Sequence, residues 1–307
     1  MIVLAGPTAS GKTDLAVLIA EALGAEIVSA DSRQVYRGLD AGTAKPAAEQ
    51  RARVRHWLLD CAEPSETFDA ARWAKEAAEA IADIRSRGKL PLVCGGTGLY
   101  LRALIDGLSP LPARDEAVRE RLRAEAEAAG PAALHARLAA ADPEAAAGIP
   151  AANLQRVLRA LEVFELTGKP NSAHWREGRG AGMRPALALR LECSPELSRE
   201  RIETRARVMW PALLAEVRSL VPSRFAGTEP GFTSLGYREA IACARGAMSS
   251  GDALEEMIRG TAAYAKRQRT WFRHQLDAEA LDASLSGPAQ LARALELWEA
   301  VREKTAA

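Results

Sequence analysis

The chain has 307 residues, 48% of them hydrophobic and 26% charged, with a formal net charge of +1. This composition is typical of a globular protein and excludes a polycationic chain, so any nucleic-acid surface must be local. No apolar run approaches the roughly 18 residues of a membrane span. The four cysteines lie far apart, which predicts reduced thiols in a cytoplasmic protein.

The first part of the chain alternates between apolar strands and helices. Residues 2–5 and 90–94 are apolar at nearly every position, as expected of parallel strands covered on both faces. A shorter strand is predicted at 26–29, and helices are predicted at about 15–22 and 70–87. Such alternation predicts an α/β fold, with a parallel sheet flanked by helices.

The composition then changes to helix-forming residues. Residues 115–141 are rich in Ala, Glu and Arg and should form helix that is mostly solvated. Asn153 is placed to cap a further helix, which Gly168 ends. We therefore interpret residues 110–180 as an inserted all-helical domain.

After the insertion, a strand that ends at Glu192 returns the chain to the sheet. The remainder is predicted to be largely helical, at about 195–221, 237–247 and 252–274. Residues 1–109 and 181–307 are thus assigned to one α/β core.

The strongest chemical signal is GPTASGKT at residues 6–13, which fits the P-loop pattern GxxxxGK[ST] between a strand and a helix. Backbone N–H groups in such a loop point at phosphate oxygens, and the helix N-terminus adds partial positive charge. Lys12 supplies a cation, and the Thr13 hydroxyl is placed to bind Mg²⁺. A diphosphate is expected to contact Gly6, Thr8, Ala9, Ser10, Gly11, Lys12 and Thr13.

The P-loop does not show which molecule carries the phosphates. ATP or GTP is the default, but the strand at 90–94 runs into Gly95-Gly96-Thr97-Gly98 and not into a metal-binding aspartate. The available carboxylate is Asp31, after the strand at 26–29, at the edge of the sheet that also carries the P-loop. From the residues alone, Asp31 is a metal ligand, a helix cap or a general base.

Six further segments join the P-loop in a recognisable order up to about residue 273: SADSRQVY (29–36), GLDAGTAKP (38–46), PLVCGGTGLYL (91–101), RVLRALE (156–162), GYRE (236–239) and YAKRQRTWFR (264–273). Together they resemble the tRNA dimethylallyltransferases, which prenylate adenosine 37 beside the anticodon. The first, third and last of these six are far more specific than the P-loop. The chain departs from the family's usual pattern at Leu235, where a smaller or β-branched residue is common.

The resemblance implies that the P-loop holds dimethylallyl diphosphate, with Mg²⁺ as cofactor. The diphosphate is then the leaving group, and the cradle stabilises charge where it develops. Asp31 is the expected base near the adenine N6, and Thr97 is a second hydrogen-bonding group. Arg205 is expected as a further diphosphate contact.

The resemblance also implies an RNA surface, because the target adenine must leave its stack to be reached. Residues expected near the flipped base are Asp31, Ser32, Arg33, Gln34 and Thr97. Four cations lie close together with aromatic residues between them, a combination that suits RNA binding: Lys266, Arg267, Arg269 and Arg273. The alternative is that the aromatic residues belong to the core and the cations to a solvated face. Further expected tRNA contacts, on the insertion, are Arg119, Gln155, Arg156 and Arg159.

Two other functions fit parts of the sequence. A small-molecule kinase would use the P-loop for ATP and residues 119–137 as a lid. A nucleotide-dependent RNA-binding module would perform no chemistry, but Asp31 and Thr97 beside the P-loop argue against it. The partners predicted are tRNA and dimethylallyl diphosphate, and a monomer is expected.

Overall fold

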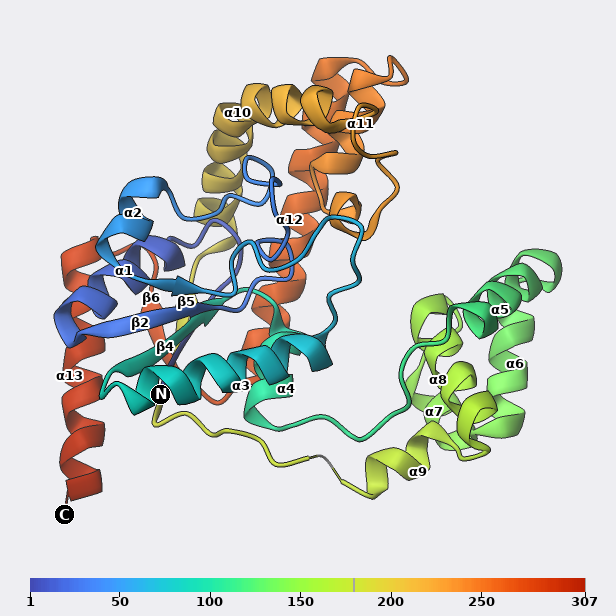
Figure 1. Ribbon diagram of the computed structural model, residues 1–307, viewed down its shortest axis with the longest axis horizontal. Helices are drawn as coiled ribbons and strands as arrows, with labels where there is room; N and C mark the ends of the chain where they lie inside the picture. The colour runs from blue at the N-terminus through green and yellow to red at the C-terminus, as the bar shows by residue number, and fades with distance from the viewer. Residues whose placement is uncertain (179, 307) are drawn as a thin grey trace. The chain divides into compact units, whose positions relative to one another are not determined.

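The computed structural model describes residues 1–178 and 180–306 and is shown in Figure 1. The chain divides into two compact units, Met1–Ile105 with Arg184–Ala307, and Asp106–Met183. The sequence had placed the insertion at 110–180.

The first unit is built on a parallel sheet. Six strands of the described residues form it, in the order β3-β2-β4-β1-β5-β6. They are β1 (Ile2–Ala5), β2 (Ala25–Ser29), β3 (His56–Trp57), β4 (Leu90–Gly95), β5 (Leu187–Glu192) and β6 (Glu279–Asp282). Neighbouring strands in this order all run parallel, which confirms the predicted α/β fold with a parallel sheet.

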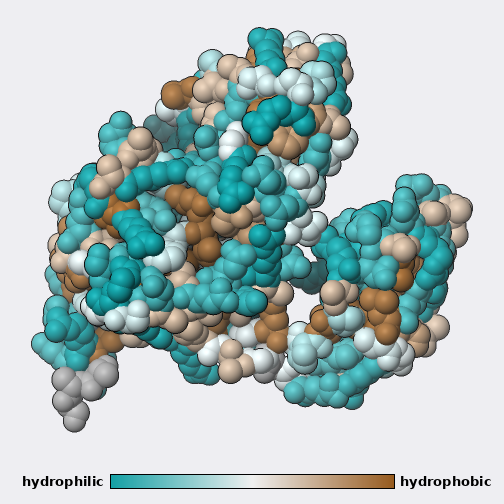
Figure 2. Space-filling model, in the orientation of Figure 1, coloured by the Kyte–Doolittle hydropathy of each residue, from teal (hydrophilic) through white to brown (hydrophobic). Residues whose placement is uncertain are grey.

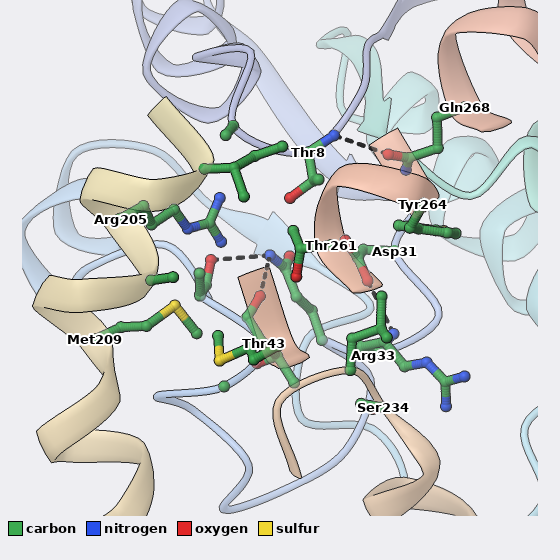
Figure 3. A pocket seen from close by; sticks show the side chains of 18 of the residues that line it. Thr8, Asp31, Arg33, Thr43, Arg205, Met209, Ser234, Thr261, Tyr264 and Gln268 are labelled. Carbon is green, nitrogen blue, oxygen red and sulfur yellow. Dashed lines mark hydrogen bonds between the residues drawn. The ribbon is translucent and has the colours of Figure 1, made fainter. Parts of the chain in front are cut away.

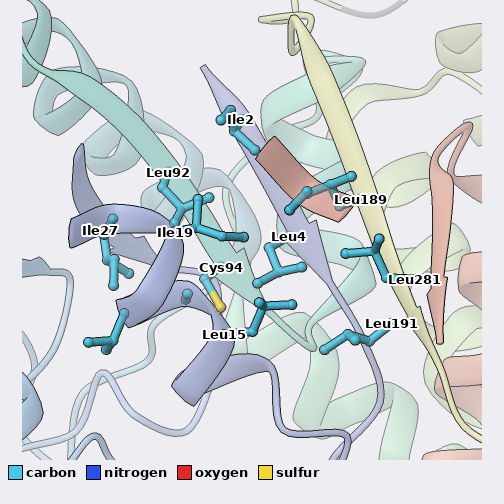
Figure 4. Close-up of a cluster of buried hydrophobic side chains, with 14 of the residues drawn as sticks. Ile2, Leu4, Leu15, Ile19, Ile27, Leu92, Cys94, Leu189, Leu191 and Leu281 are labelled. Carbon is cyan, nitrogen blue, oxygen red and sulfur yellow. The ribbon is translucent and has the colours of Figure 1, made fainter. Parts of the chain in front are cut away.

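Helices cover both faces of the sheet (Figure 1). Those of the first unit are α1 (Lys12–Leu23), α2 (Ala48–Arg53), α3 (Ala70–Ser86), α4 (Gly98–Ile105), α10 (Pro195–Leu220), α11 (Tyr237–Ala244), α12 (Ser250–Gln275) and α13 (Gly287–Ala306), with a 3₁₀ turn, η1 (Pro230–Thr233). Helices α10, α11 and α12 pack against one another. On one face of the sheet, α1 and α13 bury an aliphatic core that includes Ile2, Leu4 and Leu92 from the central strands (Figure 4).

The second unit is all-helical. Its helices are α5 (Glu116–Ala129), α6 (Pro131–Ala141), α7 (Pro143–Gly148), α8 (Leu154–Thr167) and α9 (Asn171–Arg176). Gly130, with φ of 85°, and Pro131 break the helical stretch predicted at 115–141 into two helices. This stretch is also less solvated than expected, because Leu122 and Leu138 are fully buried in a core of their own.

Several elements follow the sequence signals closely. Asn153 caps α8 by accepting a hydrogen bond from the Arg156 backbone N–H, and Gly168 ends the helix in a left-handed conformation. Helix α10 continues through Pro211 as one helix.

The short strands β3 and β6 were not predicted, because an edge strand of two to four residues carries little periodicity. Within the described part of the chain, no helix has the length and apolarity to cross a membrane.

Candidate functional site

The P-loop lies between β1 and α1 and contains two residues in the left-handed region. Ala9 has φ of 60° and Gly11 has φ of 87°. The Ser10 backbone N–H donates to the Pro7 carbonyl at 3.3 Å, which closes the turn. A Cβ atom at Gly6 would lie 2.8 Å from Ser10 Oγ, so the loop has no room for a larger residue there. This geometry turns the N-terminus of α1 toward whatever the loop binds.

Two polar side chains of the P-loop, Lys12 and Ser10, lie partly or fully buried. Lys12 Nζ donates to the Pro7 carbonyl at 3.2 Å. Burial lowers the pKa of the Lys12 ammonium, while the nearby Asp31 carboxylate acts to raise it. Ser10 Oγ is buried and has no hydrogen-bond partner among the described residues. A buried hydroxyl without a partner carries a cost that a bound anion would relieve.

The loops after three adjacent strands converge at one edge of the sheet. The P-loop follows β1, Asp31 follows β2, and the turn Gly95–Gly98 follows β4, which lies between them. A Cβ atom at Gly95 would lie 2.1 Å from the Ala30 carbonyl oxygen. β4, the strand beside β1, therefore ends where two backbone segments approach closely, at a position where many P-loop enzymes carry an acid. The carboxylate of this site, Asp31, comes instead from the end of β2, the next strand in the sheet.

Thr97 anchors the segment that carries Asp31. Its hydroxyl oxygen accepts a hydrogen bond from the Ser32 backbone N–H at 2.9 Å, and its backbone N–H donates to the Ala30 carbonyl at 3.1 Å. Asp31 Oδ1 in turn accepts from the Arg33 backbone N–H at 2.9 Å. In this structure Thr97 therefore fixes the position of the carboxylate, a role that its sequence context did not reveal.

The P-loop and the segment that carries Asp31 border a cavity of about 350 Å³ (Figure 3), a volume within the range of small-molecule sites. Its wall is formed by the P-loop, residues 31–34, residues 42–44, helix α10, residues 233–235 and helix α12. The predicted site residues on this wall are Thr8, Ala9, Lys12, Thr13, Asp31, Ser32, Arg33, Gln34, Arg205 and Arg267. The structure thus brings Asp31 and Arg205 to one cavity from segments far apart in the sequence.

Arg205 projects from α10 into this cavity (Figure 3). Burial lowers the pKa of its guanidinium, and the Asp31 carboxylate acts in the opposite direction. Arginine nevertheless stays charged in proteins. Lys12, Arg33 and Arg267 line the same cavity, so its wall is rich in positive charge, which suits a ligand with more than one negative charge.

Residues that were not predicted as site residues hold or line the wall. Tyr237, in the GYRE segment, holds residues 42–44 in place: its hydroxyl donates to Glu216 at 2.6 Å and accepts from the Gly42 backbone N–H at 3.2 Å. Gln268 lies one helical turn after Tyr264 on α12, and both line the cavity. The signal for Gln268 was its i,i+4 spacing from Tyr264 within YAKRQRTWFR.

The four predicted RNA-binding cations of α12 do not share one face. At about 100° per residue, Lys266 and Arg273 point about 140–160° away from Gln268, and both are exposed. Arg269 Nη1 donates to Ser198 Oγ on α10 at 3.0 Å. Arg267 lines the cavity. The aromatic residues divide in the same way, because Phe272 is buried whereas Tyr264 lines the cavity.

The predicted RNA contacts of the helical unit also divide. Gln155 and Arg156 are exposed at the start of α8. Arg159 is partly buried and donates to Glu162 at 2.9 Å. Arg119 is only 4% exposed, and its Nε donates to Glu162 Oε2 at 3.0 Å. The expectation that Arg119 contacts tRNA is therefore corrected: its guanidinium is used inside the helical unit, where it neutralises a fully buried carboxylate.

Replacing Arg119 is expected to affect stability and not RNA binding. In Arg119→Met, Glu162 keeps its hydrogen bond from Arg159 but loses the one from the buried Arg119. The free energy of unfolding should therefore fall by about 1–3 kcal/mol. Urea denaturation measures this fall, with Arg123→Met as the control, because Arg123 belongs to an exposed ion pair with Glu116. Weaker tRNA binding with an unchanged unfolding free energy would contradict this role.

The site can be tested for its fit to Mg²⁺. The described residues contain no cluster of three or more His, Cys, Asp or Glu side chains placed to hold a metal ion. Mg²⁺ at phosphate sites is usually held by one or two protein groups together with phosphate oxygens and water. Thr13 and Asp31 both border the cavity, and also a small adjoining cavity of about 20 Å³ onto which His56 opens. These residues fit an ion whose coordination the ligand completes.

His56 contributes an unpaired acceptor next to these residues. Its Nδ1 lies 2.8 Å from the Val54 carbonyl and must donate to it, which leaves Nε2 with a lone pair. Nε2 is buried and has no partner among the described residues. Burial lowers the pKa of His56, so the ring is neutral near pH 7. No role was predicted for His56 from the sequence, and the small cavity has room for one water molecule at this nitrogen.

Comparisons with known proteins agree with this geometry. A tRNA dimethylallyltransferase of Anaeromyxobacter sp. (strain Fw109-5) is 47% identical over 279 residues, which are 91% of this chain and 93% of that protein. The crystal structure of a full-length tRNA isopentenylpyrophosphate transferase from Bacillus halodurans is similar with a TM-score of 0.72 and 34% identity, covering 99% of this chain and 97% of that one. A eukaryotic dimethylallyltransferase acting on tRNA gives a TM-score of 0.77 at 28% identity, over 92% of this chain and 73% of that one.

The match extends to the family level. Residues 34–275 fit the family described as IPP transferase. This range begins within the segment that carries Asp31 and ends at the last residue of α12, so it includes most of the segments that build the cavity. The chain belongs to the IPP transferase family.

Proposed function

We propose that the protein transfers a dimethylallyl group from dimethylallyl diphosphate to N6 of adenosine 37 in tRNA and releases diphosphate. The high identity to proteins named tRNA dimethylallyltransferase supports this activity. The observation that carries it is the composition of the cavity wall, which places the cations Lys12 and Arg205 in one cavity with the carboxylate of Asp31. The alternative function, a small-molecule kinase, receives no comparable support, because β4, the strand beside β1, ends without an acidic residue.

The cavity offers separate surfaces to the two ends of the donor. The P-loop N–H groups, Lys12 and Arg205 suit the diphosphate. Met209, Leu235 and Met257 line the same cavity and form an apolar surface for a short isoprenoid. Leu235 stands where the family often has a smaller or β-branched residue, and we propose that it packs against the isoprenoid.

The reaction exchanges one bond for another. The bond from C1 of the dimethylallyl group to the diphosphate oxygen breaks, and a bond from C1 to the adenine N6 forms. N6 loses a proton, which Asp31 accepts as general base. The negative charge that grows on the departing diphosphate is stabilised by Lys12, Arg205 and the P-loop N–H groups. When bound at Thr13, Mg²⁺ would supply further positive charge to the phosphate oxygens.

The RNA side of the proposal rests on residues at the cavity and on the helical unit. Ser32, Arg33 and Gln34 follow Asp31 on the cavity wall and suit contacts with the flipped base. Gln155 and Arg156 are exposed and suit contacts with the anticodon stem. We place the reaction in the cytoplasm and in a monomer, and the four unpaired thiols suit a reducing compartment.

A direct assay tests the proposed function. Purified protein is incubated with labelled dimethylallyl diphosphate, Mg²⁺ and unmodified tRNA, and the tRNA is digested to nucleosides. Label should appear in N6-dimethylallyladenosine, and a tRNA with guanosine at position 37 serves as the control. Transfer of a γ-phosphoryl group from ATP without use of the isoprenoid would refute the proposal.

Arg267 should contribute to RNA affinity more than the other cations of α12. Because it lines the cavity, Arg267→Ala is expected to weaken tRNA binding and to reduce the slope of log K against log salt concentration by about one. The matched control is Arg273→Ala, on a different face of the same helix. Filter binding or fluorescence anisotropy over a salt series measures both. Equal slopes for Arg267→Ala and the wild type would remove Arg267 from the RNA surface.

A further inference from the structure

A single amide side chain joins helix α12 to the P-loop and to the turn after β4. Gln268 is 7% exposed. Its Oε1 accepts a hydrogen bond from the Thr8 backbone N–H at 2.8 Å, the contact drawn in Figure 3. Its Nε2 donates to the Gly96 carbonyl at 2.7 Å. The same side chain thus binds the P-loop through its acceptor and the turn after β4 through its donor.

The side chains of α12 pack closely on the glycines of this turn. A Cβ atom at Gly96 would lie 2.6 Å from Gln268 Nε2 and 3.3 Å from the Gly6 carbonyl oxygen. A Cβ atom at Gly98 would lie 2.6 Å from the ring of Trp271, one helical turn further along α12. Two side chains at i and i+3 on α12 therefore pack on the two glycines of the turn.

Few other side chains could make both contacts. Glutamate has no proton to donate to the Gly96 carbonyl when it is ionised, and asparagine is one methylene shorter. An apolar residue would leave the Thr8 N–H and the Gly96 carbonyl without their partner. The P-loop also holds Ala9 at φ of 60°, a conformation that persists only where the surroundings enforce it.

The contacts continue from Gly96 to the carboxylate. Thr97 follows Gly96 directly, and its hydroxyl accepts from the Ser32 backbone N–H, next to Asp31. A chain of short polar contacts therefore runs from the P-loop through Gln268 and the turn to the segment of the proposed base. Its two ends are the group that would hold the diphosphate and the group that would take the proton.

We propose that Gln268 is a positioning residue, which fixes the distance between the P-loop and the Asp31 segment so that both act on one substrate pair. The expected effect of Gln268 on turnover rests on the proposed function, whereas its expected effect on diphosphate binding does not. Gln268 orders the P-loop before the ligand arrives, so its loss weakens the binding of diphosphate and lowers the rate of transfer. A misplacement of about 1 Å at a reacting centre can cost about 100-fold in rate.

The test compares Gln268→Met and Gln268→Glu with Gln275→Met, a control at an exposed position on the same helix. Gln268→Met keeps the length and loses both hydrogen bonds. Gln268→Glu keeps the acceptor for the Thr8 N–H, loses the donor to Gly96 and adds negative charge, so it is informative even where the methionine variant folds poorly. Calorimetry with inorganic diphosphate and Mg²⁺ measures binding, and steady-state kinetics measures kcat and both KM values.

Both Gln268 variants should weaken diphosphate binding and lower kcat by about 10–100-fold, with the KM for tRNA within about twofold of the wild type. The Gln275→Met control should match the wild type. The inference would be overturned if Gln268→Glu kept both its diphosphate affinity and its kcat within about twofold of the wild type. Tighter diphosphate binding in this variant would also overturn it. A wild-type protein that binds diphosphate but transfers no isoprenoid would refute the proposed function instead, and the calorimetry would still test Gln268.

Discussion

Asp31→Asn should lower the rate of isoprenoid transfer by about 10²–10⁴-fold, the range expected when a general base is lost. The reason is the acceptor, because the lone pair of an adenine N6 is delocalised into the ring and the amine becomes a good nucleophile only as its proton leaves. Asparagine suits this test better than alanine. Its carbonyl oxygen can still accept the hydrogen bond that Asp31 Oδ1 receives from the Arg33 backbone N–H, so the segment keeps its shape.

The measurement is a single-turnover rate with tRNA already bound, which separates chemistry from binding and product release. The affinity for tRNA should change little, because a neutral amide replaces one carboxylate on the cavity wall. Asp277→Asn, at an exposed position just after α12, is the matched control and should leave the rate unchanged. An unaltered single-turnover rate in Asp31→Asn would show that the base lies elsewhere.

Lys12→Met should have the second largest effect, a loss of about 10²–10³-fold in kcat. Lys12 lies partly buried in the P-loop, where desolvation lowers the pKa of its ammonium and its attraction to phosphate is screened less than it would be at the surface. Charge on the diphosphate grows as the bond to the isoprenoid breaks, so the cation acts more strongly on the transition state than on the bound donor. The rate should therefore fall by more than the affinity for the donor does.

The test of this prediction is whether Lys12→Met lowers kcat by more than it lowers the affinity for the donor. Kinetics over a range of donor concentrations gives kcat and KM, and calorimetry with a non-hydrolysable donor analogue gives the affinity separately. Lys75→Met, on the exposed face of α3, is the control for loss of one positive charge. If Lys12→Met changed only the affinity and left kcat as it was, Lys12 would bind the donor without assisting departure of the diphosphate.

Local signals in the sequence were enough for the elements closest to the P-loop. Residues 2–5 are apolar throughout because both faces of β1 are covered, and all four are buried in the structure. The P-loop, its helix and the glycine that ends this helix follow from backbone requirements that only a few residue types meet. Asp31 could be placed at the site because parallel strands bring their carboxyl ends to one edge of the sheet.

Contacts between distant segments were beyond the reach of the sequence. The burial of Arg119 depends on Glu162, 43 residues away, and charge alone does not distinguish an internal ion pair from an RNA contact. The cations of α12 were assigned to one surface because they are close in sequence, but helical rotation sends them in different directions.

The sequence by itself determined the P-loop, the α/β class and the carboxylate beside the loop, since each depends on local backbone geometry or on strand direction. Only the tertiary structure decided which side chains meet at the cavity. Gln268 reaches the Thr8 N–H across 260 residues of chain, and such a contact is fixed by how α12 packs on the turn after β4. Packing of that kind depends on many weak contacts made together, and no short segment contains them.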